Sequence, residues 1–218
     1  MLLAVALQAA AQITYEDYRR QMLAARAIMT ETDDENAKRH EYARMDSLNN
    51  LALTAKAEEF KNNARTPGQL RAAAMFLRSI GLEADALDAE RNGAKVGDPY
   101  CLNRLLIHYI SSGAPKKQVI GLMKLINDDC LTYLPLLHNM AMALRYYCDL
   151  DLKYALPYAK LFVANTERSR KLKRSESLNM SSQYICLDFT DNTWYTPKSS
   201  STPKKYMQRL IEASETSK

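Results

Sequence analysis

The chain has 218 residues, of which 47% are hydrophobic, so it is long enough to bury one full core. Only 6 Gly stand against 10 Met, and Ala, Leu, Arg, Lys and Glu are abundant, which favours helices over the many turns of a β-sandwich. The net charge of +5 is mild and 25 acidic residues are spread through the chain, so composition predicts an all-α protein and does not indicate nucleic acid as a partner.

The first eleven residues carry no charge and end in Ala9-Ala10-Ala11 before Gln12. A short apolar run followed by small residues is typical of a signal peptide, and this run is too short to span a bilayer. No basic residue precedes it, so the alternative is that it forms the first turns of a helix. We expect residues 1–11 to be a signal peptide whose removal leaves no integral membrane segment. The protein would then be exported, periplasmic or extracellular, and otherwise cytoplasmic.

Residues 12–65 are predicted to form an N-terminal helical hairpin. Apolar residues recur from Thr14 at the three- and four-residue spacing of one helix face, at Tyr18, Met22, Ala25 and Met29. Polar residues at 30–36 offer caps and first-turn acids for a second, longer helix that reaches about Asn62. Its expected apolar face contains Tyr42, Met45, Leu48, Ala52, Ala55 and Phe60.

A regular spacing of helix starts begins at Thr66 and defines a repeat region over residues 66–188. Thr66-Pro67 and Asp98-Pro99 each fit an N-cap followed by proline at the first helical position. Further helical segments are predicted to begin at Leu82-Glu83, Pro115, Leu134 and Asp151, and the apolar stripe of the one after Pro115 runs to Ile126. A seventh helical segment is expected around Leu178–Leu187. Corresponding residues of the later segments lie 36 or 37 positions apart, as Pro99 and Pro135 do. Such a period indicates an α-solenoid of antiparallel helix pairs, with Leu105, Tyr109, Leu144 and Tyr147 mostly buried.

The return helices of these pairs carry a second pattern. One reads Ala86, Ala89-Glu90, Gly93-Ala94 and Gly97, and the other reads Ala155, Tyr158-Ala159 and Phe162-Val163. With this spacing, the region from Thr66 to Asn165 resembles the tetratricopeptide-like superfamily, and within it the Sel-one-like subclass. The resemblance implies a superhelix whose usual work is to hold another protein.

Residues 189–218 are predicted to form a polar loop and a C-terminal capping helix. The loop contains Trp194 and Tyr195, which would either pack onto the last helices or anchor a partner. Thr202-Pro203 would cap the helix, whose apolar side is Tyr206, Met207, Leu210 and Ile211.

The sequence supports a non-enzymatic role in binding a protein or peptide, because no catalytic, metal or cofactor motif is found in it. In helical repeats, the first helix of each pair lines the groove, so polar residues outside its apolar stripe are candidate contacts. These candidates are Asn103, Arg104, His108, His138, Asn139, Met142 and Arg145. We expect no catalytic residue, cofactor or metal ligand, and the oligomeric state stays open.

Two other functions are kept as alternatives. The basic run at 168–174, together with Lys198, Lys204, Lys205 and Arg209, could bind nucleic acid or another anionic surface, although export argues against nucleic acid. An all-helical enzyme with a dispersed site is the second alternative.

Four Cys, at positions 101, 130, 148 and 186, could pair in an oxidising compartment. Cys101 and Cys130 are expected at the same end of one helical hairpin, so theirs is the pairing we would consider. The competing interpretation is four small buried hydrophobic residues.

Overall fold

The computed structural model describes residues 13–171, 183–198 and 201–216. Most of these residues are helical, which confirms the prediction of an all-α chain apart from one short β-hairpin. No helix in these ranges combines the length and the apolar character needed to cross a membrane. The predicted signal peptide lies outside the described residues.

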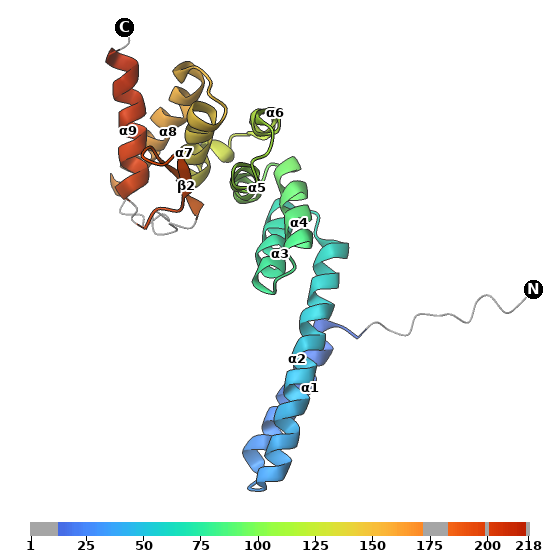
Figure 1. Cartoon of the computed structure of the whole chain (residues 1–218). Helices are drawn as coiled ribbons and strands as arrows, with labels where there is room; N and C mark the ends of the chain where they lie inside the picture. The colour runs from blue at the N-terminus through green and yellow to red at the C-terminus, as the bar shows by residue number, and fades with distance from the viewer. Residues whose placement is uncertain (1–12, 172–182, 199–200, 217–218) are drawn as a thin grey trace, which may run out of the picture.

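The predicted N-terminal hairpin is formed by α1 (Tyr15–Glu31) and α2 (Glu35–Asn63), which lie side by side as a rod projecting from the other helices (Figure 1). Thr14 begins α1 with a capping box, because its hydroxyl accepts from the Asp17 backbone while the Asp17 carboxylate accepts from the Thr14 backbone. Tyr42, expected on the apolar face of α2, is instead 61% exposed, because α1 covers only one side of its partner.

Three helices begin at the residues that the sequence indicated: α3 (Pro67–Ser79), α4 (Glu83–Lys95) and α5 (Pro99–Ser111). The Asp98 carboxylate caps α5 by accepting a 2.8 Å hydrogen bond from the Cys101 backbone. Each of these helices buries apolar residues at helical spacing: Leu70, Ala73, Ala74, Leu77, Ala86, Ala89, Ala94, Leu102, Leu105, Leu106 and Ile110.

The predicted arm after Pro115 is shorter than expected. Helix α6 (Lys116–Gly121) gives way to a single 3₁₀ turn, η1 (Leu122–Leu125), and the chain then leaves the helical path. Asn127 holds the new direction, because its side chain donates to the Gly97 carbonyl at 3.2 Å and accepts from the Cys130 backbone at 3.0 Å. A second 3₁₀ turn, η2 (Cys130–Thr132), precedes α7.

Helix α7 (Leu134–Met142) is the most enclosed element, since every one of its residues is buried. It continues as a π-helical turn, η3 (Ala143–Tyr147), and α8 (Leu152–Lys171) follows. Of the four residues predicted to be mostly buried, Leu105 and Leu144 are buried, while Tyr109 and Tyr147 are only half-buried. Tyr147 stays near the surface because its hydroxyl donates to the Ala114 carbonyl.

The prediction of a seventh helical arm around Leu178–Leu187 is wrong for residues 183–187, the part of it that the structure describes. Strand β1 (Cys186–Asp188) pairs antiparallel with β2 (Thr193–Tyr195), so the expected loop also contains a strand. The turn between the strands is tightened by Asn192, whose φ is 59°. Trp194 packs toward the protein, with its ring centroid 6.3 Å from that of Tyr147.

The C-terminal helix α9 (Ser201–Thr216) begins one residue before the predicted Thr202 cap and packs on α8. Its Met207 and Leu210 are buried, as expected. All four Cys are free and buried, so the structure contains no Cys101–Cys130 disulfide and agrees with the buried-hydrophobe interpretation.

Candidate polypeptide-binding site

Residues 183–186, which run from the 3₁₀ residue Gln183 into strand β1, lie against α5 and α7 and are held through their backbone. Asn103 Nδ2 on α5 donates to the Gln183 carbonyl at 3.0 Å, and Asn139 Nδ2 on α7 donates to the same oxygen at 2.7 Å. The Ile185 amide donates to Asn139 Oδ1 at 2.9 Å. Two neighbouring helices therefore bind the main chain of another segment with side-chain amides. We call residues 183–186 the self segment.

The two asparagines occupy equivalent places, because each stands four residues after the proline near the start of its helix. They also bond to each other, with Asn139 Nδ2 donating to Asn103 Oδ1 at 2.8 Å. The equivalent residue of α3 is Arg71, which does not contact the self segment in any hydrogen bond between described residues. Its Nε and Nη2 donate instead to Asp98 Oδ2, at 2.9 and 2.5 Å.

His138 and Cys186 form part of the same buried network. His138 Nδ1 lies 2.9 Å from Asn139 Oδ1, and His138 Nε2 lies 4.0 Å from Cys186 Sγ. Burial lowers the pKa of His138 to about 4 and raises the pKa of Cys186 to about 12. At neutral pH both groups are therefore uncharged. Cys186, His138 and Asn139 lie in a row within the core, but the cysteine is a thiol and not a reactive thiolate.

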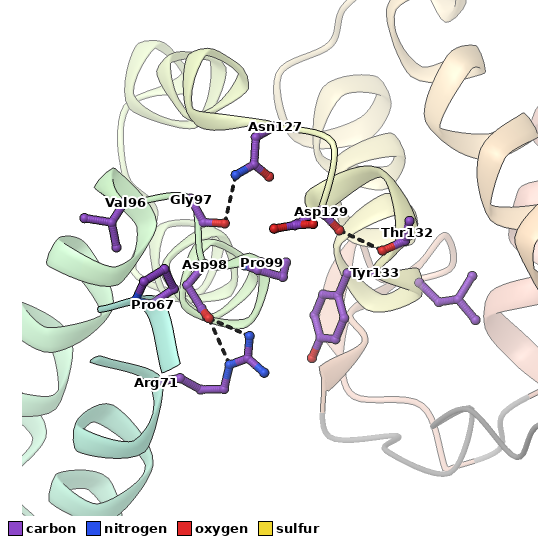
Figure 2. A pocket seen from close by; sticks show the side chains of 11 residues that line it. Pro67, Arg71, Val96, Gly97, Asp98, Pro99, Asn127, Asp129, Thr132 and Tyr133 are labelled. Atoms are coloured by element: carbon purple, nitrogen blue, oxygen red, sulfur yellow. Dashed lines mark hydrogen bonds and ion pairs between the residues drawn. The ribbon is translucent and has the colours of Figure 1, made fainter. Parts of the chain in front are cut away.

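A cleft of about 350 Å³ opens beside the self segment, between the α4–α5 turn and the start of α7 (Figure 2). The Arg71–Asp98 pair lies on one side of it and Asp129 on the other. The Tyr133 hydroxyl, also in the lining, donates to the Gln183 side chain and so links the cleft to the self segment. The remaining lining residues are Pro67, Val96, Gly97, Pro99, Asn127, Thr132 and Leu134.

Gly97 is required at the rim of this cleft for two reasons. Its φ of +83° is a conformation that other L-residues rarely adopt. An added Cβ would also lie 2.2 Å from Asn127 Nδ2, the group that donates to the Gly97 carbonyl. The rim is therefore fixed by both the backbone and the Asn127 side chain.

A second polar cluster joins α3, α4 and α5. Glu90 on α4 is 0% exposed, and its Oε1 accepts from Arg78 Nη2 at 2.7 Å and lies 3.6 Å from Arg104 Nε. Among the residues that the structure describes, Glu90 Oε2 and the Nε atoms of both arginines are buried and make no hydrogen bond. The buried Glu90 carboxylate is thus paired with two arginines from neighbouring helices, and this ion-pair cluster joins α3, α4 and α5.

The cleft and the cluster share one surface. Arg71 and Arg78 are two turns apart on α3, and Tyr100 and Arg104 are one turn apart on α5, so each pair projects from one side of its helix. Burial raises the pKa of Tyr133, and its electrostatic neighbours include Tyr100, Arg71 and Arg104. We call Arg71, Arg78, Tyr100 and Arg104 the α3–α5 face.

The structure divides the seven contact residues predicted from the sequence. Four are fully buried and unavailable to an external partner as placed: Asn103, His138, Asn139 and Met142. Arg104 is partly exposed on the α3–α5 face, and Arg145 donates to the Leu150 carbonyl at 3.0 Å. His108 is exposed while His138 is enclosed, so the two imidazoles do not share a site. Sequence reasoning missed Arg71, although the shared position after each proline would have identified it.

The basic run at 168–174 lies largely outside the described residues. Its Arg168 is exposed, as are Lys198, Lys205 and Arg209, while Lys204 is half-buried. Across residues 13–171, 183–198 and 201–216, no three His, Cys, Asp or Glu side chains gather as metal ligands. In comparisons with known proteins, no protein-family model, no curated protein and no solved structure matches this chain.

Proposed function

We propose that this protein is a non-enzymatic helical-repeat protein that binds an extended polypeptide through the α3–α5 face and the adjoining cleft. One observation carries the proposal: the next helices of the same series already bind the main chain of the self segment through Asn103 and Asn139. The self segment hydrogen-bonds to Asn103 of α5 and Asn139 of α7, and Arg71 is the equivalent residue of α3.

The α-solenoid is part of this proposal. Support comes from the alternation of helices that begin at equivalent residues and pack on their neighbours in the chain: α3 on α4, α4 on α5, and α7 on α8. In such a stack the first helices of successive pairs line one face, so Arg71, Asn103 and Asn139, which hold equivalent positions in α3, α5 and α7, would lie along that face. The tetratricopeptide-like resemblance fits this order. Action in the cell envelope or outside the cell is proposed from the apolar start alone, and sequencing the mature N-terminus tests it.

The test uses the full chain and a display library of random twelve-residue peptides. Selected peptides are measured by fluorescence anisotropy against the wild type, Arg71→Ala and Arg104→Ala. We expect each substitution to weaken binding by about tenfold, the effect of losing one hydrogen bond to a charged group.

Arg91→Ala is the matched control, because Arg91 is an exposed arginine on α4 that pairs only with Asp88 among the ion pairs of the described chain. Its affinity for the peptides should equal that of the wild type. The proposal is wrong if the folded wild type selects no peptide, or if the selected peptides bind both α3–α5 variants as tightly as the wild type.

A further inference from the structure

The cleft beside the self segment is lined by one carboxylate that has no partner within the described chain. Asp129 is exposed, and its side chain makes no ion pair or hydrogen bond with any residue that the structure describes. It stands at the N-cap of η2, yet its carboxylate caps no backbone N–H of that turn. Figure 2 shows the side chain directed across the cleft, toward Gly97 and Pro99 of the α4–α5 turn.

The other charges of the lining cancel each other. Asp98 is 0% exposed, and its Oδ2 accepts from Arg71 Nε at 2.9 Å and from Arg71 Nη2 at 2.5 Å. The remaining lining residues apart from Asp129 are neutral. One positive and two negative groups therefore give the lining a net charge of −1, which is located on Asp129. An anionic group would meet that charge with no unpaired cation of the lining to offset it.

Apolar surface surrounds the unpaired carboxylate. The half-buried Tyr133 contributes its ring, and its hydroxyl is already bound to the Gln183 side chain. The other apolar lining residues are Pro67, Val96, Pro99 and Leu134. Lys and Arg side chains lay their methylene stems on apolar surface and keep their charged end beside polar groups. A cleft with apolar walls and one unpaired acid matches that distribution.

We propose that this cleft binds a basic side chain, Lys or Arg, of the partner polypeptide, with its charged end on the Asp129 carboxylate and its stem against Pro99 and the Tyr133 ring. Charge complementarity carries the choice of occupant, because one positive charge neutralises the lining. This inference rests on the proposed function and names the side chain that the partner presents to the cleft. Asp129 would then set the specificity for a positive charge.

The first measurement exchanges each Lys or Arg of a peptide selected on the wild type, one at a time, for norleucine, which has an apolar stem and no charge. At one position we expect the exchange to weaken binding by about fivefold, the upper range for one ion pair at a protein surface. On Asp129→Asn the same exchange should change the affinity by less than about twofold, because the charge that it senses is gone.

Asp128→Asn is the matched control. Asp128 is the neighbouring exposed carboxylate, and it does not line the cleft, so its removal takes the same charge from the same loop. The norleucine exchange should cost as much on this variant as on the wild type. Charge reversal adds a gain of binding: Asp129→Lys should bind the peptide with Glu at the sensitive position more tightly than the peptide with Lys there.

The second measurement uses the wild type alone. In the complex, nuclear Overhauser contacts should join the methylene protons of the sensitive Lys or Arg to the Tyr133 ring. The ring of Tyr42, exposed on the N-terminal hairpin, should show no contact with that side chain.

The outcomes separate this inference from the proposed function. If no peptide binds the folded wild type, both are wrong. If peptides bind and no norleucine exchange weakens them, or if the full loss persists on Asp129→Asn, polypeptide binding stands and the basic-residue site is overturned. A loss that disappears on Asp128→Asn as well would assign the preference to the charge of the whole loop and would overturn the site too. Absence of the Tyr133 contacts would place the basic side chain outside the cleft, with the same consequence.

Discussion

The N-terminal hairpin and α7 show two different ways in which a helix is stabilised in this protein. Every residue of α7 is buried between its neighbours, whereas α1 buries only Ala25. The hairpin leaves Leu23, Tyr42 and Leu51 at least 49% exposed. Its link to the remaining helices is at the far end of α2, where Phe60 packs on Phe76. Local signals therefore sustain the hairpin, while tertiary packing sustains α7, and opening of the hairpin should cost less free energy than global unfolding.

The largest effect is expected from a cavity beside α7. Phe162 is 0% exposed, with its ring 5.9 Å from that of His138, so Phe162→Ala should lower the free energy of unfolding by about 3–5 kcal/mol. Leu23→Ala on the hairpin is the control and should change it by less than about 0.5 kcal/mol, because Leu23 is 57% exposed. Urea unfolding measures both. Equal costs would mean that the two regions are packed alike.

The second largest effect is expected from lowering the pH, which should destabilise the α7 region. The folded pKa of His138, about 4, lies below its ordinary 6.5, so the unfolded chain takes up a proton first as pH falls. Stability is then complete above about pH 6.5 and is lost toward pH 4, by up to about 3 kcal/mol.

Measuring unfolding between pH 7 and pH 5 separates the protonation of His138 from that of most carboxylates, which ordinarily titrate at about pH 4. The loss should disappear in His138→Gln and persist in His108→Gln, since His108 is exposed. A flat pH profile in the wild type would contradict the burial of a neutral imidazole.

Removing the side chain that holds the self segment should cost about 2 kcal/mol. Asn139→Ala leaves the buried Ile185 amide without its acceptor and the Gln183 carbonyl with fewer donors. Hydrogen exchange at the Ile185 amide should accelerate, and the global free energy should fall. Asn49→Ala, at an exposed site of α2, is the matched change on the hairpin and should leave the Ile185 exchange rate unaltered.

The smallest effect belongs to the hairpin itself. Thr14→Ala removes the side-chain half of the capping box at the start of α1, the hydroxyl that accepts from the Asp17 backbone, and should cost about 1 kcal/mol, confined to local opening. Amide exchange in α1 should accelerate while exchange in α7 does not change. Thr54→Ala, at an exposed mid-helix position of α2, should accelerate neither. Faster exchange in α7 after Thr14→Ala would show that the two regions unfold together.

Part of the binding surface could be inferred from the sequence. The search for polar residues on first helices selected Asn103, Arg104 and Asn139, and all three lie in the polar networks described above. It did not foresee that the self segment covers the two asparagines, because that contact joins residues 80 and 44 positions apart. Glu90 was overlooked as well, since its role depends on arginines contributed by two other helices.

The sequence by itself determined where helices begin, because caps and prolines act on the nearest turn: Thr14, Thr66 and Asp98 each cap the helix expected after them. Periodicity likewise placed the buried stripes of α3 to α5. Only the tertiary structure decided that Ile185 and Leu187, which have helical spacing in the sequence, lie on extended chain. There the Ile185 amide donates to Asn139 and the Leu187 carbonyl accepts from the Tyr206 hydroxyl, and hydrogen bonds to distant residues leave no periodic trace in a sequence.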